Sequence, residues 1–403
     1  MNALYRALRL GFVAADAVVP KSWLPGLEPD VLIAASGSNP GPDAREALRR
    51  LMASIMTESD LSVFGRVSLH WDVLRLLRNA QTVEAAHRVS PALAKAPVSQ
   101  PLFILGLPRS GTTFLHELMA QDSESLVPRN WQTIYPAPRP ANFNPLNDKR
   151  VQAVDRQLRI FAGLAPGFSD LHPITADSPQ ECTEIMAHVF QSLRFDATHR
   201  VPSYFAWLEA HGYLQAFRFH KQFLQFLQNG APGRWVLKCP DHTFTLDAIL
   251  QVYPDARFVI VHRNPIAVLA SVARLTWVLR KPFLRKIDPA EIGAQVSERW
   301  IQGANLLLDF DRRADVAAER KIHIHYDELA GAPLAVIARI YARFGMPLRA
   351  EALAAMSRLI AAKPRGGYAR HAPYSLENFK LSQAALQQRF VPYVRQYCRA
   401  GGA

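Results

Sequence analysis

A strand–loop–helix segment near residue 100 constrains the fold of this chain more than any other. The apolar run Phe103–Gly106 predicts a buried strand, and a helix is predicted to open within Ser110–Thr113. Gly106 and Gly111 have the spacing of the pattern G-x-x-x-x-G-K-[ST], whose backbone N–H groups surround an oxyanion at a helix N-terminus. The segment therefore predicts a binding loop for a nucleotide phosphate.

The loop differs from that pattern in the position of its cation. Thr112 stands where the pattern has lysine, and Arg109 supplies a positive charge from inside the loop. This exchange argues against an ordinary ATPase or GTPase. The residues expected to hold the phosphate end of a nucleotide are Arg109, Ser110, Gly111, Thr112 and Thr113.

A second segment predicts another buried strand followed by an arginine. Phe258–Val261 is continuously apolar, as in a parallel strand covered on both faces, and His262 and Arg263 follow it. Ligands of open α/β sheets bind beyond the carboxyl ends of the strands. Ser271 lies eight residues after Arg263, about two helical turns, and so returns to a similar helix face. The alternative is that Arg263 caps or pairs locally.

Together the two segments resemble the nucleotide-dependent sulfotransferases, which use 3′-phosphoadenosine 5′-phosphosulfate (PAPS) as donor. The 5′-phosphosulfate loop of that family is similar to Pro108–Thr113, and its 3′-phosphate site has an Arg and a Ser eight residues apart, like Arg263 and Ser271. Lys363–Gly367 is similar to the family's basic glycine-containing loop over the 3′-phosphate. Tyr374–Phe379 resembles a run found in a largely bacterial branch. The resemblance spans about residues 100–382.

The resemblance implies a role for each matched residue. Sulfuryl transfer relies on positioning and on stabilisation of charge. Arg109 would stabilise the charge that develops on the departing bridging oxygen. Backbone N–H groups and hydroxyls of Gly111–Thr113 would hold the 5′-phosphate, and the arrangement requires no metal. The residues expected at the 3′-phosphate are Arg263, Ser271, Arg365 and Gly366.

The base that takes the proton of the acceptor is left open. Arg234–His242 is predicted to be a buried strand that ends in polar groups, and the matching strand of cytosolic sulfotransferases ends Lys-Thr-His. Lys238 matches the lysine, Pro240 stands at the histidine position, and His242 follows two residues later. An unperturbed histidine titrates near about 6.5, which suits base catalysis. The alternative for His242 is a polar residue at a helix start.

Carboxylates offer other candidates for the base. Some sulfotransferases use a glutamate after the loop helix, but this chain has Gln132 where its branch commonly has Glu. A helix predicted to begin at Pro179 would place Glu181 in its first turn. There Glu181 and Glu184 either pair with the helix dipole or face the acceptor. The candidates, in order, are His242, Glu181 and His172.

The charge balance agrees with an anionic donor. The chain has 403 residues and a formal net charge of +13, and a basic surface attracts anionic ligands. Nucleic acid is not expected as a partner, because the sequence has no helix-turn-helix signal, zinc spacing or lysine-rich stripe. Three scattered cysteines, Cys182, Cys239 and Cys398, predict no disulfide framework and favour a reducing cytoplasm.

The predicted architecture is an α/β, three-layer P-loop-NTPase-like fold with a central parallel sheet. Residues 1–98 are expected to form a helical region packed on the core, and 99–383 the catalytic domain. That domain contains a helical insertion at 150–230, and a helix or tail follows at 384–403. The first twenty residues predict an amphipathic helix rather than a signal peptide, with membrane-surface contact as the minor alternative.

The predicted function is PAPS-dependent sulfuryl transfer to a hydroxyl or amine of a small-molecule, glycan or lipid acceptor. One alternative is an ATP-dependent P-loop phosphotransferase, which the missing lysine and Arg263 oppose. The other is a non-catalytic homologue that binds PAPS or its 3′,5′-bisphosphate product (PAP). The sequence names neither the acceptor nor the oligomeric state.

Overall fold

The structure is a computed structural model that describes residues 3–140, 142–362 and 375–398. The chain divides into two compact units, each built from separated stretches of sequence. Unit 1 comprises Met1–Pro97, Pro128–Ala231 and Leu275–Ile287, and unit 2 comprises Val98–Val127, Pro232–Arg274 and Asp288–Ala403.

Unit 2 contains a parallel five-stranded sheet in the order β2-β3-β1-β4-β5. The strand β1 lies at its centre, with Ile104 opposite Lys238 of β3 on one side and Val259 of β4 on the other. Every residue of β1 is buried, because both faces of the sheet are covered. The strands are β1 Leu102–Gly106, β2 Ser125–Leu126, β3 Arg234–Lys238, β4 Arg257–His262 and β5 Lys321–His325.

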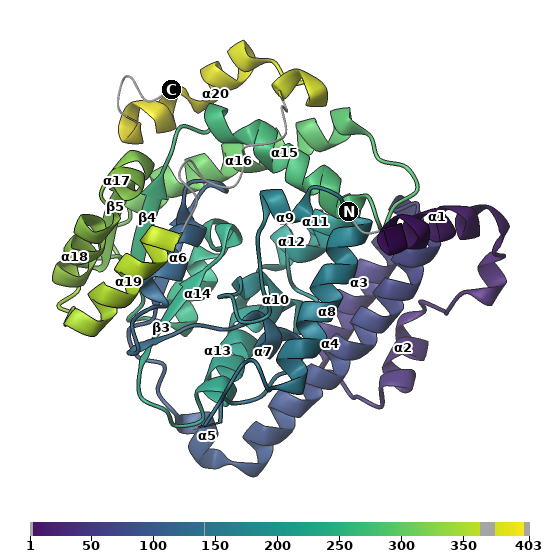
Figure 1. Ribbon diagram of the computed structural model, residues 1–403, viewed down its shortest axis with the longest axis horizontal. Coiled ribbons are helices and arrows are strands. Elements are labelled where there is room, and N and C mark those ends of the chain that lie inside the picture. Colours follow the sequence, from purple (N-terminus) through teal and green to yellow (C-terminus); the bar gives the residue numbers. More distant parts are fainter. Residues whose placement is uncertain (1–2, 141, 363–374, 399–403) are drawn as a thin grey trace. The chain divides into compact units, whose positions relative to one another are not determined.

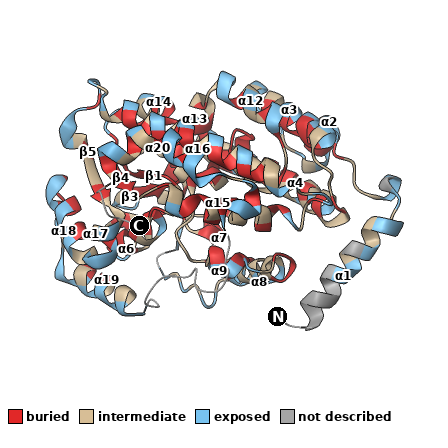
Figure 2. Ribbon diagram, turned by 90° about the horizontal axis from the view of Figure 1, so that it is seen from above, coloured by how far each residue is buried: buried red, intermediate tan, exposed pale blue. Residues whose placement is uncertain are grey.

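Alternate side chains of the strands enter two different cores, and this gives unit 2 three layers. Ile104 packs with Leu115 of α6 and Ile337 of α18. Phe103 and Phe258 point to the other face, where the Phe258 ring contacts Phe310 of α16 with centroids 4.9 Å apart. Figure 2 shows α6, α17, α18 and α19 on one side of the sheet and α14, α16 and α20 on the other.

The predicted three-layer α/β arrangement is thus confirmed. The helices of unit 2 are α6 Thr112–Met119, α14 Leu246–Val252, α16 Pro289–Asp311, α17 Tyr326–Gly331, α18 Pro333–Arg343, α19 Ala350–Ala362 and α20 Gln383–Tyr397, with 3₁₀ turns η3 Pro240–Phe244, η4 Ala318–Arg320 and η5 Leu376–Phe379. Helix α15, Ile266–Arg280, starts in unit 2 and ends in unit 1.

The described part of unit 1 is helical (Figure 1). Its N-terminal region and the insertion predicted at 150–230 fall in the same unit. Its helices are α1 Ala3–Val18, α2 Pro29–Ser36, α3 Pro42–Glu58, α4 Val63–Val89, α5 Pro91–Lys95, α7 Asn130–Ile134, α8 Lys149–Leu164, α9 Phe168–Leu171, α10 Cys182–Met186, α11 Arg194–Thr198, α12 Pro202–His211 and α13 Leu214–Gln228, with 3₁₀ turns η1 Lys21–Trp23 and η2 Ala187–Val189.

Two local predictions in unit 1 were wrong. The proline-rich stretch 126–146 has no regular period and predicts a long loop, but it contains α7 with the fully buried Trp131. The helix predicted from Pro179 begins at Cys182, so that Glu181 occupies its N-cap position rather than its first turn. Pro179 instead pairs with Arg129 in an isolated antiparallel bridge, which keeps this stretch extended.

Candidate functional site

The loop between β1 and α6 has a backbone that only particular residues tolerate. Gly106 has a φ of 148° and Gly111 a φ of 93°, both in the region that favours glycine. A Cβ on Gly106 would lie 2.5 Å from the carbonyl oxygen of Val261, and one on Gly111 would lie 3.0 Å from the ring of Tyr326. Both glycines are therefore required for the backbone to pass this close to its neighbours.

Two hydroxyl groups of this segment, those of Ser110 and Thr112, belong to buried residues. Ser110 is fully buried, and its Oγ has no hydrogen-bond partner among the described residues. Thr112 is buried as the first residue of α6, whereas Thr113 is exposed. A buried hydroxyl without a partner is costly unless a ligand satisfies it, so the loop fits an oxygen-rich group.

Lys238 brings a second cation to this loop. It is the last residue of β3, retains only 2% exposure, and its Nζ donates to Thr113 Oγ1 at 3.2 Å. An ammonium group is expensive to bury, and a negatively charged ligand offsets that desolvation. Lys238 therefore lies at the carboxyl end of β3 and contacts the first turn of α6, next to the loop.

Arg263 contacts the loop as well. Its Nη1 donates to the carbonyl oxygen of Arg109 at 2.8 Å, and its Cζ lies 3.8 Å from the centroid of the Tyr326 ring. Arg109 has a φ of 66°, an uncommon conformation for a residue with a Cβ. The hydrogen bond from Arg263 and the contact of Tyr326 with Gly111 both support this strained loop.

The remaining residues of the predicted 3′-phosphate site divide into two groups. Ser271 lies on α15 and is 8% exposed. Arg365 and Gly366 lie outside the described residues. Arg109 itself is half-buried within the loop.

His242 lies in the core of unit 2. It belongs to η3, is fully buried, and its ring packs edge-on against Phe103 with centroids 5.1 Å apart. Phe103 occupies the sheet face opposite to the core that contains Ile104. Full burial leaves the imidazole without solvent access, and a packing role is the plain explanation for this position.

The other two base candidates lie in unit 1. Glu181 is half-buried at the N-cap of α10, and its backbone N–H donates to Gln180. His172 is half-buried beside Phe168, with ring centroids 5.9 Å apart. Gln132, which replaces the expected glutamate, has a structural role, because its side chain accepts from Arg129 N and donates to Ala137 O.

A buried ionic cluster surrounds Glu184 in unit 1. Glu184 accepts from Arg194 at 2.7 Å, and Asp72 pairs with both Arg194 and Arg75. Burial raises the pKa of Glu184 to about 7, partly offset by Arg75. A carboxyl group that titrates near neutrality can exchange a proton at working pH.

One contact of the loop in unit 2 and one property of the ionic cluster in unit 1 were missed or undervalued in the sequence. Tyr326 directly follows β5, so the strand-end rule that identified Arg263 could have identified it too. The neutral-range pKa of Glu184 depends on Arg75 and on burial, and neither can be read from its local sequence.

Within the described residues, none of the helices combines the length and apolar character that crossing a bilayer requires. Nowhere in the described ranges do three or more histidine, cysteine or acidic side chains gather in a way that could hold a metal ion.

The chain is similar to known proteins in sequence and in fold. Residues 101–350 match the profile of a family described as the sulfotransferase family. A curated relative, omega-hydroxy-beta-dihydromenaquinone-9 sulfotransferase Stf3 of Mycobacterium bovis, is 23% identical over 284 residues, covering 66% of this chain and 67% of the relative.

Two solved structures are similar over most of their length. Sulfotransferase STF9 from Mycobacterium avium has a TM-score of 0.83 and 28% identity, covering 93% of this chain and 97% of its own. Sulfotransferase STF1 from Mycobacterium tuberculosis H37Rv has a TM-score of 0.79 and 29% identity, covering 90% and 98% respectively.

Proposed function

This chain belongs to the sulfotransferase family and is an enzyme, and from that premise we propose that it transfers a sulfuryl group from PAPS to a hydroxyl or amine of an organic acceptor. The observation that carries the proposal is the convergence of Lys238 and Arg263 on the loop that contains Arg109. The unpartnered Ser110 Oγ in the same loop supports an oxygen-rich ligand there.

The proposed reaction uses these groups to position charge. The acceptor oxygen or nitrogen attacks the sulfur of PAPS while the bond from sulfur to the bridging oxygen breaks, and the electron pair of that bond stays on the 5′-phosphate. Arg109 and Lys238 stabilise the growing negative charge on the phosphate, and a base takes the acceptor proton. The products are the sulfated acceptor and PAP.

Arg263 and Ser271 are proposed to bind the 3′-phosphate, which distinguishes PAPS from ATP. Arg263 presents a planar guanidinium backed by the Tyr326 ring, a geometry suited to a phosphate group. The curated relative carries the name of a sulfotransferase for a hydroxylated quinone, and this supports a hydroxyl group as acceptor.

The identity of the base stays a prediction. Full burial of His242 leaves its ring without solvent access, whereas Glu181 is half-buried. We propose that His242→Gln, Glu181→Gln and His172→Gln be compared through kcat as a function of pH. Loss of the true base should lower kcat by about 10²–10⁴-fold and remove the acidic limb of the profile, with little change in Km for PAPS.

Binding of PAP without magnesium tests the proposed function. We expect calorimetry to show PAP binding at least about 100-fold tighter than adenosine 5′-phosphate binding. This ratio corresponds to about 2.7 kcal/mol of binding free energy, a moderate value for one phosphate held by an arginine and a hydroxyl. The double variant Arg263→Ala with Ser271→Ala should lose that preference and retain weak binding of adenosine 5′-phosphate.

A matched control comes from a cation outside the site. Arg339 is half-exposed and pairs with Glu328, so Arg339→Ala should leave PAP affinity unchanged. Equal affinity for the two nucleotides, or binding that requires magnesium, would overturn the PAPS proposal and favour a phosphotransferase.

A further inference from the structure

A row of hydrogen-bonded side chains passes next to Arg263, the arginine proposed to bind the 3′-phosphate of PAPS. Tyr393 Oη lies 2.8 Å from His262 Nδ1, and His262 Nε2 lies 2.8 Å from His323 Nδ1. His323 Nε2 lies 3.0 Å from Asp311 Oδ1. The four residues come from α20, β4, β5 and α16, and we call them the imidazole chain. It links the last helix of the described chain to the sheet.

The donors and acceptors of the imidazole chain can be assigned from its fixed end. The Asp311 carboxylate can only accept, so His323 Nε2 carries a hydrogen, and Nδ1 of a neutral His323 accepts. His262 must then donate from Nε2, which leaves its Nδ1 to accept from the Tyr393 hydroxyl. Every donor therefore points in one direction, from Tyr393 to Asp311.

Tyr397, one turn further along α20, contacts two members of the imidazole chain. Its ring stacks on His262 with centroids 3.9 Å apart and planes inclined by 10°, and its hydroxyl donates to Asp311 Oδ2 at 3.0 Å. Tyr393 and Tyr397 are four residues apart and share one face of α20. This face of α20 therefore contacts the last residue of β4 and the last residue of α16.

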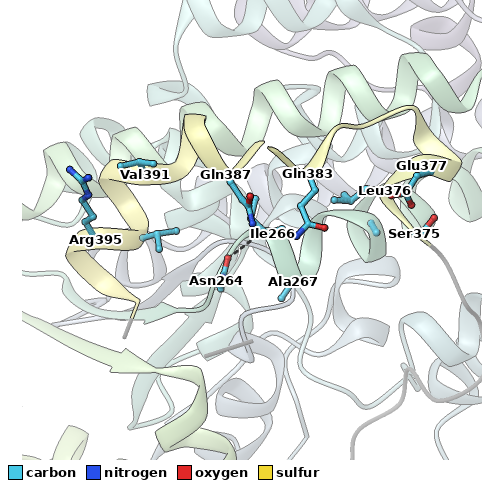
Figure 3. A pocket seen from close by; sticks show the side chains of 12 residues that line it. Asn264, Ile266, Ala267, Ser375, Leu376, Glu377, Gln383, Gln387, Val391 and Arg395 are labelled. Carbon is cyan, nitrogen blue, oxygen red and sulfur yellow. Dashed lines mark hydrogen bonds between the residues drawn. The ribbon is translucent and has the colours of Figure 1, made fainter. Parts of the chain in front are cut away.

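Another side of α20 borders a pocket instead of a packed neighbour. A cavity of about 800 Å³ lies between α20 and the start of α15, lined by Gln387 and Arg395 on one side and by Asn264 and Ile266 on the other (Figure 3). The tyrosines share the task of holding α20 with the buried Leu386 and Phe390 and with Arg389, which pairs with Glu298 of α16.

The imidazole chain joins the two strands whose following residues, Arg263 and Tyr326, lie at the donor site. His262 is followed at once by Arg263, and His323 precedes Tyr326 by three residues. Arg263 and Tyr326 are in turn in contact with each other. A shift of either strand end would therefore move the guanidinium away from the Arg109 carbonyl that it contacts.

We propose that His262 is a positioning residue for Arg263, and that acid weakens donor binding by breaking the bond between His262 and His323. The proposal rests on the proposed function, because it concerns the same 3′-phosphate site. A proton added to His323 Nδ1 would face the N–H of His262 at 2.8 Å, so two donors would oppose each other. The neutral chain has no such conflict.

The environment of the chain agrees with a neutral state. Burial lowers the pKa of His262 well below its usual value and also lowers that of His323, for which Asp311 partly compensates. A histidine whose pKa is lowered by folding takes up its proton first in the unfolded state. The free energy of unfolding therefore falls as pH drops below the unfolded-state pKa of about 6.5. The other titratable or charged groups that face the chain are His325, Lys321, Arg312, Cys398 and Asp327.

The test compares PAP affinity in two single variants. His323→Phe keeps a ring against Tyr397 and removes both hydrogen bonds. The matched control is His325→Phe, because His325 lies two residues away on β5 and 6.1 Å from the His262 ring, with no hydrogen bond to it recorded among the described residues. Kd for PAP is measured by calorimetry from about pH 8 to about pH 5, a range that spans the usual histidine pKa of about 6.5.

We expect His323→Phe to raise Kd for PAP roughly tenfold at about pH 8, equivalent to about 1.4 kcal/mol. The ratio of its Kd to that of the wild type should fall toward about one only as pH drops below about 6.5, because burial lowers the pKa of His323 in the folded protein. Protonation of the nucleotide phosphates changes both Kd values by the same factor, so its effect cancels in this ratio. The control should give a ratio of about one throughout, and Tyr393→Phe should give a smaller rise of about threefold at high pH, since it removes one neutral hydrogen bond.

Hydrogen exchange of the α20 amides provides a readout without nucleotide. After correction for intrinsic rates, acid should speed exchange in the wild type more than in His323→Phe. A pH-independent ratio of Kd values, or a ratio near one at high pH, would overturn the proposal even if both proteins are folded. If the wild type fails to bind PAP, the proposed function fails and the positioning role with it. PAP binding with no effect of His323→Phe would overturn this inference alone.

Discussion

Replacing Arg109 with alanine should lower kcat for sulfuryl transfer by about two to three orders of magnitude, the typical loss when one donor to a developing oxyanion is removed. Arg109 is the cation inside the loop, held at a φ of 66° by the hydrogen bond from Arg263. Alanine carries a Cβ as arginine does, so the backbone demand at this position is unchanged. The loss should therefore report the missing charge.

The measurement is steady-state kcat and Km for PAPS, with PAP binding by calorimetry alongside. Arg109→Lys should recover part of kcat, because a lysine returns the charge without the planar fork of donors. Arg339→Ala should behave as the wild type, since Arg339 forms a surface ion pair with Glu328. An Arg109→Ala enzyme with weak PAP binding but normal kcat at saturating donor would show that the charge serves binding only.

Gly106→Ala is expected to produce the largest loss of stability among single substitutions in the loop. The added Cβ would meet the backbone oxygen of Val261 at 2.5 Å, and the φ of 148° is one that residues with a Cβ rarely adopt. Overpacking against backbone costs about 1–3 kcal/mol, and a disallowed backbone conformation about 1–3 kcal/mol more. We expect the free energy of unfolding to fall by roughly 3 kcal/mol.

Gly345→Ala provides the matched control for the steric part. Gly345 also has a positive φ, of 61°, but a Cβ there would meet nothing within 4 Å. It should lose only about 1 kcal/mol. The measurement is the urea midpoint of each variant at constant m-value. Equal losses for the two glycines would mean that the close approach to Val261 is relieved by movement of the strand.

The loop and the sheet could be predicted because their signals are local. Phe103–Gly106 and Phe258–Val261 are short apolar runs, and both form buried parallel strands. The glycine spacing fixed the turn after β1, where the structure has a positive φ at both glycines. In such segments apolar residues indicate burial, and glycine indicates where the backbone can adopt a positive φ.

Predictions that depended on distant partners were less successful. Glu181 was placed inside a helix from local capping rules, but the bridge between Arg129 and Pro179 keeps the preceding stretch extended. The support of Arg263 by Tyr326 requires two strand ends to meet, and the imidazole chain requires four separate elements. The local sequence of any one of these elements carries no sign of the others.

If Arg263 binds the 3′-phosphate as proposed, its hydrogen bond to the Arg109 carbonyl couples the two ends of the donor energetically. A 3′-phosphate that fixes Arg263 also steadies the loop that receives the 5′-phosphosulfate. Occupation of one end then strengthens binding at the other, and by reciprocity the coupling free energy is the same in both directions. Under that proposal, the bisphosphate product would engage both ends after the sulfuryl group has left, and its release would have to break a cooperative pair of contacts. We therefore expect product release rather than bond making to limit turnover.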